Sequence, residues 1–291
     1  MERTMADLQR LIASKEFGSS EDLKSFLGSM VGKTVPEYDH SQSPEDQAQK
    51  LVYDARDALT RIQRIKLARQ ALELSKDCAD AYLILATEAG TAEESVRLLR
   101  EAVAAGERSL GPETMEEDVG HFWGLFETRP YMRARADLAQ VCWELGDRTE
   151  ALDHLRDLLR LNPNDNQGLR YVLIDYLLQS RLDEEAEALL AQYDDEIGAP
   201  WAYSEALLLF RRHGSTPAAN AALTSAFETN PHVPLFLLRR RRMPKRLPEY
   251  VVLGDQSEAV SYVYGAMKAW VQTDGALAWL RQHLGPANSK R

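Results

Sequence analysis

The chain has 291 residues, a formal net charge of −10 and 44% hydrophobic residues, a composition typical of a folded protein. The acidic balance argues against general nucleic-acid binding, because that function needs a basic surface. No stretch approaches the roughly 20 apolar residues that cross a bilayer and the first residues lack the apolar run of a secretory signal, so we expect a cytoplasmic protein that does not enter a membrane.

Residues 1–43 are expected to form an N-terminal helical arm or cap followed by a linker. Leu8, Leu11 and Ile12 indicate a short helix. Ser20, followed by two acidic residues, is typical of the start of a second helix, with the serine as its cap. A turn-rich stretch then leads to Pro44.

Residues 44–242 carry the signature of the tetratricopeptide (TPR) repeat, a helix–turn–helix unit of 34 residues. Segments that begin at Met132 and Pro200 lie 68 positions apart, twice that period, and agree with the template at seven positions each. In both segments a glycine lies where the chain leaves the first helix, a place that favours positive φ. A proline follows the second helix, which it cannot continue. The matching pairs are Leu138 and Ala206, Ala139 and Leu207, Cys142 and Phe210, Gly146 and Gly214, Ala151 and Ala219, Leu155 and Leu223, Pro163 and Pro231.

Three further units are predicted from the same pattern, over residues 45–74, 79–106 and 167–193. The last of these has Arg181 in place of the turn glycine. The sequence therefore predicts an all-α fold, an α-solenoid of about five TPR-like helix pairs with helical caps at both ends. Each pair hides its apolar face only by stacking on its neighbours, so the ends need caps.

Residues 107–131 interrupt the 34-residue rhythm with an insertion too aromatic for a disordered segment. One interpretation is that Phe122 and its apolar neighbours fill a gap between imperfectly stacked units. The other is a ligand-facing loop. Its candidate binding residues are His121, Trp123, Glu127, Arg129 and Tyr131.

Residues 162–171 form a second polar patch, with three asparagines in five positions. Asparagine and aspartate cap helices and make side-chain turns, so capping explains much of the patch. Asn166, Arg170 and Tyr171 are also binding candidates, because an amide both donates and accepts hydrogen bonds and an arginine can hold a carboxylate.

Residues 243–291 are predicted to form a C-terminal helical cap, with one helix after Asp255 and a last one from Asp274 to Leu284. Just before it lies the basic run Arg239–Arg242, continued by Lys245 and Arg246. Such a run is usually a solvated face; the alternatives are contact with an acidic partner or with the backbone of RNA.

Three motifs of this chain resemble those of the suppressor-of-tumorigenicity-seven family. They are Gly-His-Phe-Trp-Gly at residues 120–124, Glu-Thr-Arg-Pro-Tyr-Met-Arg at residues 127–133, and Asn-Pro-Asn-Asp-Asn-Gln-Gly at residues 162–168. The resemblance spans about residues 48–284 and is to the bacterial, soluble type, whose members are described as TPR proteins. It implies the helical-repeat fold and supplies no catalytic residues.

Neither metal nor catalytic chemistry is indicated by the spacing of the reactive residues. The six histidines are scattered, and Cys78 and Cys142 fall inside predicted helices as small buried hydrophobic residues. We therefore expect no cofactor, no metal and no enzymatic activity. An alternative interpretation joins His121, Glu127 and Cys142 in a catalytic set.

The leading functional prediction is a scaffold that binds a protein or peptide segment on its concave side, which the first helix of each pair lines. The candidates that point away from the packing positions are Arg133, Gln140, Trp143, Arg170, Tyr171, Trp201 and Ser204. The alternative is a small-molecule or catalytic pocket formed where the 121–131 insertion meets the 162–171 turn. The partner and the oligomeric state stay open.

Overall fold

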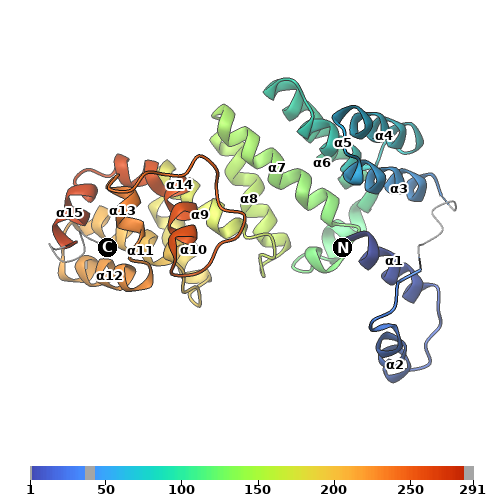
Figure 1. Cartoon of the computed structure of the whole chain (residues 1–291), viewed down its shortest axis with the longest axis horizontal. Helices are drawn as coiled ribbons and strands as arrows, with labels where there is room; N and C mark the ends of the chain where they lie inside the picture. Colours follow the sequence, from blue (N-terminus) through green and yellow to red (C-terminus); the bar gives the residue numbers. More distant parts are fainter. Residues whose placement is uncertain (1, 37–42, 285–291) are drawn as a thin grey trace. The chain divides into compact units, whose positions relative to one another are not determined.

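The computed structural model of the chain describes residues 2–36 and 43–284. Within those ranges all regular secondary structure is helical, which confirms the all-α prediction. The chain divides into two compact units, an N-terminal unit of residues 1–166 and a C-terminal unit of residues 167–291 (Figure 1). The three-part division expected from the sequence stays a prediction.

Eight α-helices and one short 3-10 helix make up the described part of the N-terminal unit. They are α1 (Glu2–Ala13), α2 (Ser20–Met30), α3 (Pro44–Asp57), α4 (Arg61–Leu74), α5 (Ala79–Thr87), α6 (Ala92–Glu117), η1 (Phe122–Gly124), α7 (Arg129–Leu145) and α8 (Arg148–Leu161). The described part of the C-terminal unit holds α9 (Leu169–Ser180), α10 (Asp183–Gln192), α11 (Ala199–His213), α12 (Pro217–Thr229), α13 (Val233–Leu237), α14 (Gln256–Gln272) and α15 (Ala276–His283).

The five predicted helix pairs are confirmed. Helices α3 and α4, α5 and α6, α7 and α8, α9 and α10, and α11 and α12 pack on each other in turn. Gly146 has a φ of 93° at the end of α7, as its template position requires. Arg181 takes over that role at the end of α9 with a φ of 61°, a left-handed conformation that is uncommon outside glycine.

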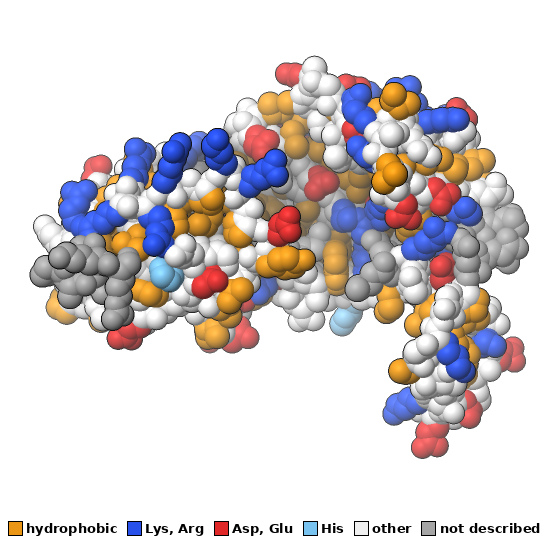
Figure 2. Space-filling model, viewed as in Figure 1, with side chains coloured by type: hydrophobic (Ala, Val, Ile, Leu, Met, Phe, Trp, Pro, Cys, Tyr) orange, Lys and Arg blue, Asp and Glu red, His pale blue; other side chains and the backbone are white. Residues whose placement is uncertain are grey.

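Polar and charged side chains cover much of the visible surface of both units, with apolar ones scattered among them (Figure 2). The apolar side chains that hold the helices together are buried. In the N-terminal unit Leu83, Leu99 and Leu138 belong to one core cluster, the α5–α8 core, which also includes Ala151 of α8. Burial of such surface is the main favourable term in folding.

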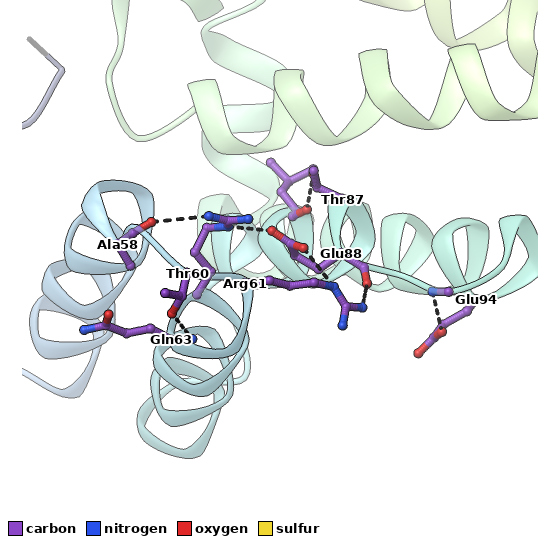
Figure 3. Close-up of polar contacts among 10 residues, drawn as sticks. Ala58, Thr60, Arg61, Gln63, Thr87, Glu88 and Glu94 are labelled. Carbon is purple, nitrogen blue, oxygen red and sulfur yellow. Dashed lines mark hydrogen bonds and ion pairs between the residues drawn. The ribbon is translucent and has the colours of Figure 1, made fainter.

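The ends of the early helices are fixed by polar contacts around Glu88, which follows α5 (Figure 3). Its carboxylate forms an ion pair with Arg61, 3.1 Å from Nε, and accepts a hydrogen bond from Arg64 on the same helix. The side chain of Thr60 caps α4 by accepting from the Gln63 amide at 3.3 Å. These contacts join the start of α4 to the end of α5, so consecutive pairs are fastened at their turns as well as through their apolar faces.

Two boundaries differ from the prediction. The cap of α2 is Ser19 and not Ser20, since the Ser19 hydroxyl accepts from the amide of Asp22 at 3.2 Å. Helix α6 was expected to end near Gly106 but continues to Glu117, across a kink at Gly111 with a φ of 72°. The first part of the predicted insertion is therefore helical, and the non-helical connection begins only at Asp118.

Helix α14 does more than close the end of the C-terminal unit. It packs against α9 and α11, the first helices of their pairs, as well as against α13 and α15. Gln179 of α9 donates to the carbonyl of Gly265 at 3.1 Å, and Glu258 accepts from the amide of Ala199 at the start of α11 at 2.9 Å. The chain thus covers in this unit the same helices that we expected to line an open binding face.

Candidate functional site

Each helix pair of the N-terminal unit has a first helix, and these three helices, α3, α5 and α7, pack side by side. They share one buried carboxylate. Asp80 at the start of α5 is 1% exposed. Arg56 of α3 approaches its Oδ1 to 2.8 Å, and Arg133 of α7 donates to both of its oxygens at 2.9 Å. A buried charge needs such pairing, so Arg133, a sequence candidate for partner binding, holds three helices together.

A cleft of about 410 Å³ opens beside Asp80. Its lining comes from α1, α3, the start of α5, α6 and the segment that leads into α7. The lining residues are Arg10, Glu45, Asp46, Gln49, Tyr53, Ser75, Asp77, Cys78, Ala79, Asp80, Gly106, Ser109, Phe126, Glu127 and Pro130. The cleft thus combines five carboxylates with a few apolar side chains, a composition that suits a cationic ligand with some apolar surface.

The five carboxylates of the cleft differ in what they contact. Asp46 lies 3.0 Å from Arg10, Asp77 lies 2.7 Å from Arg108, and Asp80 is held by its two arginines. Glu45 and Glu127 are exposed, and no other described residue forms an ion pair with either of them. These two carboxylates are consequently the negative charges that the cleft can offer to a ligand.

The thiol that lines the cleft belongs to Cys78. Burial raises the pKa of Cys78 to about 12, so the group is protonated at neutral pH. Cys142 lies in the α5–α8 core, where burial and the nearby carboxylate of Glu150 raise its pKa to about 11. Both cysteines are buried, as the sequence predicted.

The insertion packs mostly on itself. Phe122 is buried, and the buried Thr128 hydroxyl donates to the Phe122 and Leu125 carbonyls. Arg129 places its guanidinium 4.0 Å from the ring centre of Phe126 and donates to the carbonyl of Trp123 at 3.0 Å. These contacts support the gap-filling interpretation of the segment.

Of the five insertion candidates only Glu127 lines the cleft. His121 is exposed and Trp123 half-buried, whereas Tyr131 is 2% exposed, so its predicted place on a ligand-facing loop is wrong. The Tyr131 hydroxyl accepts from Arg135 at 3.1 Å. Aromatic residues in a short insertion can indicate either a ligand site or residues buried in the core. Tyr131 belongs to the buried residues.

The polar patch after α8 also serves the fold. Asn162 and Asp165 are buried, while Asn166 is exposed. The amide of Gly120 donates to the carbonyl of Leu161 at 3.0 Å, which ties the insertion to the end of α8. Within the N-terminal unit the cleft includes residues of the insertion but none of residues 162–166.

In the C-terminal unit Arg170 does hold a carboxylate, but one from its own chain. Both Arg170 and the Tyr171 hydroxyl bond to Glu196, the latter at 2.7 Å. Burial and that carboxylate raise the pKa of Tyr171 to about 12. Trp201 is 6% exposed and packs edge-on to Tyr171 with ring centres 5.4 Å apart.

Two candidates of this unit are not on an open surface. Trp201 donates to the Leu190 carbonyl at 3.3 Å, and Ser204 is fully buried. Trp201 packs against the rings of Tyr171 and Tyr193, whereas Ser204 lies on α11, against which α14 packs. The sequence carried a signal for this, because apolar residues form one broad face of α14 that needs other helices to bury it, namely Ala259, Val260, Tyr262, Val263, Ala266 and Trp270.

The two remaining candidates lie on α7. Gln140 is exposed and donates to Glu144 at 3.1 Å, one turn further on. Trp143 is partly buried against the α5–α8 core, with the guanidinium of Arg148 5.2 Å from its ring centre. Over the described residues no group of three or more histidine, cysteine or acidic side chains is arranged to hold a metal ion.

Comparison with known proteins identifies the family. A family model described as ST7 protein matches residues 35–284. This chain belongs to the ST7 protein family. It is 33% identical over 241 residues to the Suppressor of tumorigenicity 7 protein-like of Rattus norvegicus, an alignment that covers 75% of this chain and 43% of the rat protein.

Other ST7 relatives are similar to the same degree. The human Suppressor of tumorigenicity 7 protein-like is 33% identical over 241 residues, with 75% of this chain and 42% of the human protein covered. The Protein ST7 homolog of Drosophila melanogaster is 32% identical over 242 residues, with 74% and 44% covered. This ST7-family chain thus spans less than half the length of the curated relatives it matches.

Among solved structures the ST7-family chain is similar to YrrB, described as a TPR protein with an unusual peptide-binding site. The TM-score is 0.45 at 17% identity, over 64% of this chain and 84% of that chain. Within the described ranges, no helix of this chain is both long and apolar enough to span a membrane.

Proposed function

We propose that the N-terminal unit is a protein-interaction scaffold whose cleft binds a partner segment with lysine or arginine side chains. The observation that carries this proposal is the pair Glu45 and Glu127. They line the cleft from different elements, and among the residues that the structure describes neither has the arginine partner that every other carboxylate of the lining has.

The charge of the chain supports a basic partner. The whole excess of negative charge falls within residues 1–166, because acidic and basic residues are equal in number over residues 167–291. Complementary charge brings partners together faster and rejects wrong ones, while apolar contact supplies much of the affinity. Tyr53, Phe126 and Pro130 offer such apolar contact in the same cleft.

The proposed role of the sequence candidates changes accordingly. Glu127 contacts the partner, and Arg133 supports the cleft through Asp80. Gln140 and Trp143 lie further along α7 and extend the proposed surface beyond the cleft. Arg170 and Tyr171 hold the C-terminal unit together through Glu196, and Trp201 packs on Tyr171. The cytoplasmic location, the bacterial origin and the lack of an enzymatic role stay predictions.

Fluorescence anisotropy with the full chain and labelled peptides tests the proposal. Three peptides of equal length, rich in lysine and arginine, in glutamate, or in serine, separate charge from length. We expect the basic peptide to bind and the other two not to bind at moderate salt. The double variant Glu45→Gln/Glu127→Gln is expected to weaken that binding about tenfold, since each lost ion pair at an exposed site contributes under about 1 kcal/mol.

The matched control is Glu116→Gln/Glu117→Gln. It removes the same charge from an exposed end of α6 outside the cleft. Equal weakening by both double variants would mean that peptide binding depends only on the net charge of the unit. The cleft would then not be the binding site. No binding of the basic peptide at low salt would contradict the proposal as well.

A further inference from the structure

The connection between α13 and α14, residues 238–255, holds six of the 14 lysines and arginines of the C-terminal unit. We call it the basic connection. It has no regular secondary structure, and Lys and Arg side chains gather over this part of the unit (Figure 2). Its cations are Arg239, Arg240, Arg241, Arg242, Lys245 and Arg246, against two acidic residues, Glu249 and Asp255.

Five of these cations are open to a ligand. Arg239, Arg240, Arg242, Lys245 and Arg246 are exposed, and no other described residue forms an ion pair with any of them. Arginines elsewhere in the unit differ: Arg170 contacts Glu196, and Arg211 lies 2.5 Å from Asp183. The basic connection is therefore a block of uncompensated positive charge on a unit whose other arginines are largely paired.

The same connection holds apolar side chains in water. Tyr250 is 81% exposed, and the exposed apolar residues continue through Leu247, Val251, Val252 and Leu253. The backbone behind them is anchored. The Val252 amide donates to the Ser257 hydroxyl and the Gly254 amide to Glu258, each at 2.8 Å. A cluster of exposed apolar residues on an anchored backbone indicates an interaction site.

We propose that the basic connection docks on the surface of an anionic lipid bilayer. Clusters of four to eight lysines and arginines bind anionic headgroups, with each cation near the surface increasing partitioning about fivefold. Tyrosine and aliphatic side chains beside such a cluster enter the boundary between headgroups and acyl chains. RNA or an acidic peptide would contact the cations but leave the three consecutive residues Val251–Leu253 in water.

Co-sedimentation of the full chain with lipid vesicles tests this proposal. We expect binding to vesicles of phosphatidylcholine with about one third phosphatidylserine, no binding to phosphatidylcholine alone, and weakening as salt is raised. The double variant Arg239→Gln/Arg240→Gln is expected to bind about 25-fold more weakly. Its matched control is Lys268→Gln/Arg281→Gln, which removes two exposed cations of the same unit from α14 and α15 and is expected to bind almost as the wild type does.

A second variant separates lipid from nucleic acid. Tyr250→Ser/Val251→Ser keeps every charge and is expected to weaken vesicle binding, with thermal unfolding by circular dichroism confirming that the chain is folded. Three outcomes would overturn the proposal: no binding to anionic vesicles at low salt, equal loss in the Lys268/Arg281 control, or arginine-dependent binding to single-stranded RNA without vesicle binding. None of these outcomes bears on the cleft of the N-terminal unit, so the two proposals stand or fall separately.

Discussion

Arg133 of α7 donates to both carboxylate oxygens of Asp80 on α5, at 2.9 Å each, across 53 positions of sequence. Arg56 of α3 completes the arrangement from the other side. One carboxylate thereby fixes the relative positions of three helices that each also belong to a different pair. Because Asp80 lines the cleft, the same contact sets the shape of the proposed binding site.

Asp80→Asn should destabilise the N-terminal unit by about 2–3 kcal/mol. Breaking a fully buried ion pair costs about 3–5 kcal/mol, and the loss is smaller here because the Arg56 and Arg133 side chains are 32% and 24% exposed. Urea unfolding followed by circular dichroism measures the change. Arg108→Gln, which breaks the exposed pair with Asp77, is the control and should cost under about 1 kcal/mol. Similar losses in both variants would contradict the special role of Asp80.

Gly106→Ala should destabilise the packing of α6 on α7. An added Cβ would lie 2.8 Å from the Cβ of Tyr131 and 3.1 Å from its backbone Cα, which cannot turn aside. Overpacking costs about 1–3 kcal/mol, more than the gain of up to about 1 kcal/mol from replacing a helical glycine. Thermal unfolding measures the sign. Gly28→Ala in α2, where nothing lies within 4 Å of the added Cβ, should be neutral or stabilising, so a stabilised Gly106→Ala variant would refute the packing argument.

The repeat pattern predicted the helix pairs because each template position has a local cause. A glycine at a helix end and a proline after the next helix act within a few residues, so Gly146 and Pro163 were placed correctly. The serine pair Ser19–Ser20 left the α2 cap uncertain by one residue, since either hydroxyl suits the role. Arg181 shows the limit of the rule, because the turn formed without the glycine.

The ion-pair partners of the charged candidate residues could not be predicted from the sequence. Arg133 meets Asp80 and Arg170 meets Glu196 only after distant segments fold together. The burial of Ser204 depends on α14, which begins more than 50 positions later along the chain. The repeat pattern predicts which residues point away from the other helix of their pair. It does not predict which distant segment of the chain packs against those residues.

Asp175 should make the stability of the C-terminal unit fall as pH rises above about 4. Burial raises its pKa well above the ordinary value of 3.8. The unfolded chain therefore loses this proton near pH 4 while the folded chain keeps it, and the folded state is favoured less as pH increases toward the raised pKa. The slope is at most about 1.4 kcal/mol per pH unit for one group.

Asp175→Asn tests that dependence because asparagine has nearly the same shape and no proton to lose. Urea unfolding at several pH values above 4 should show a smaller decline with pH in the variant than in the wild type. The acid faces Gly265 of α14, where an added Cβ would lie 1.8 Å from its Oδ2, so the expected effect belongs to the contact of α9 with α14. Identical slopes in the two proteins would mean that Asp175 ionises freely in the folded chain.

Glu258 should be the most costly acidic residue to replace in the C-terminal unit. It is 3% exposed, and its oxygens accept from the amides of Ala199 and Gly254 and from the side chain of Asn230, at 2.8–2.9 Å. It thereby caps α11, whose own N-cap residue, Gly198, has no side chain to do so. Glu258→Gln keeps the length but turns an N–H toward one of these donors, so the expected loss is about 2–3 kcal/mol.

Urea unfolding of Glu258→Gln beside Gln256→Ala measures this loss, since Gln256 is exposed in the same first turn of α14 and should cost under about 0.5 kcal/mol. Hydrogen exchange locates the effect: the amides of Ala199 and Gly254 should exchange faster in the Glu258 variant, because both lose their acceptor. Unchanged protection of these two amides would mean that Glu258 is replaceable by solvent. The capping of α11 by α14 would then contribute nothing to holding the last helix pair in place.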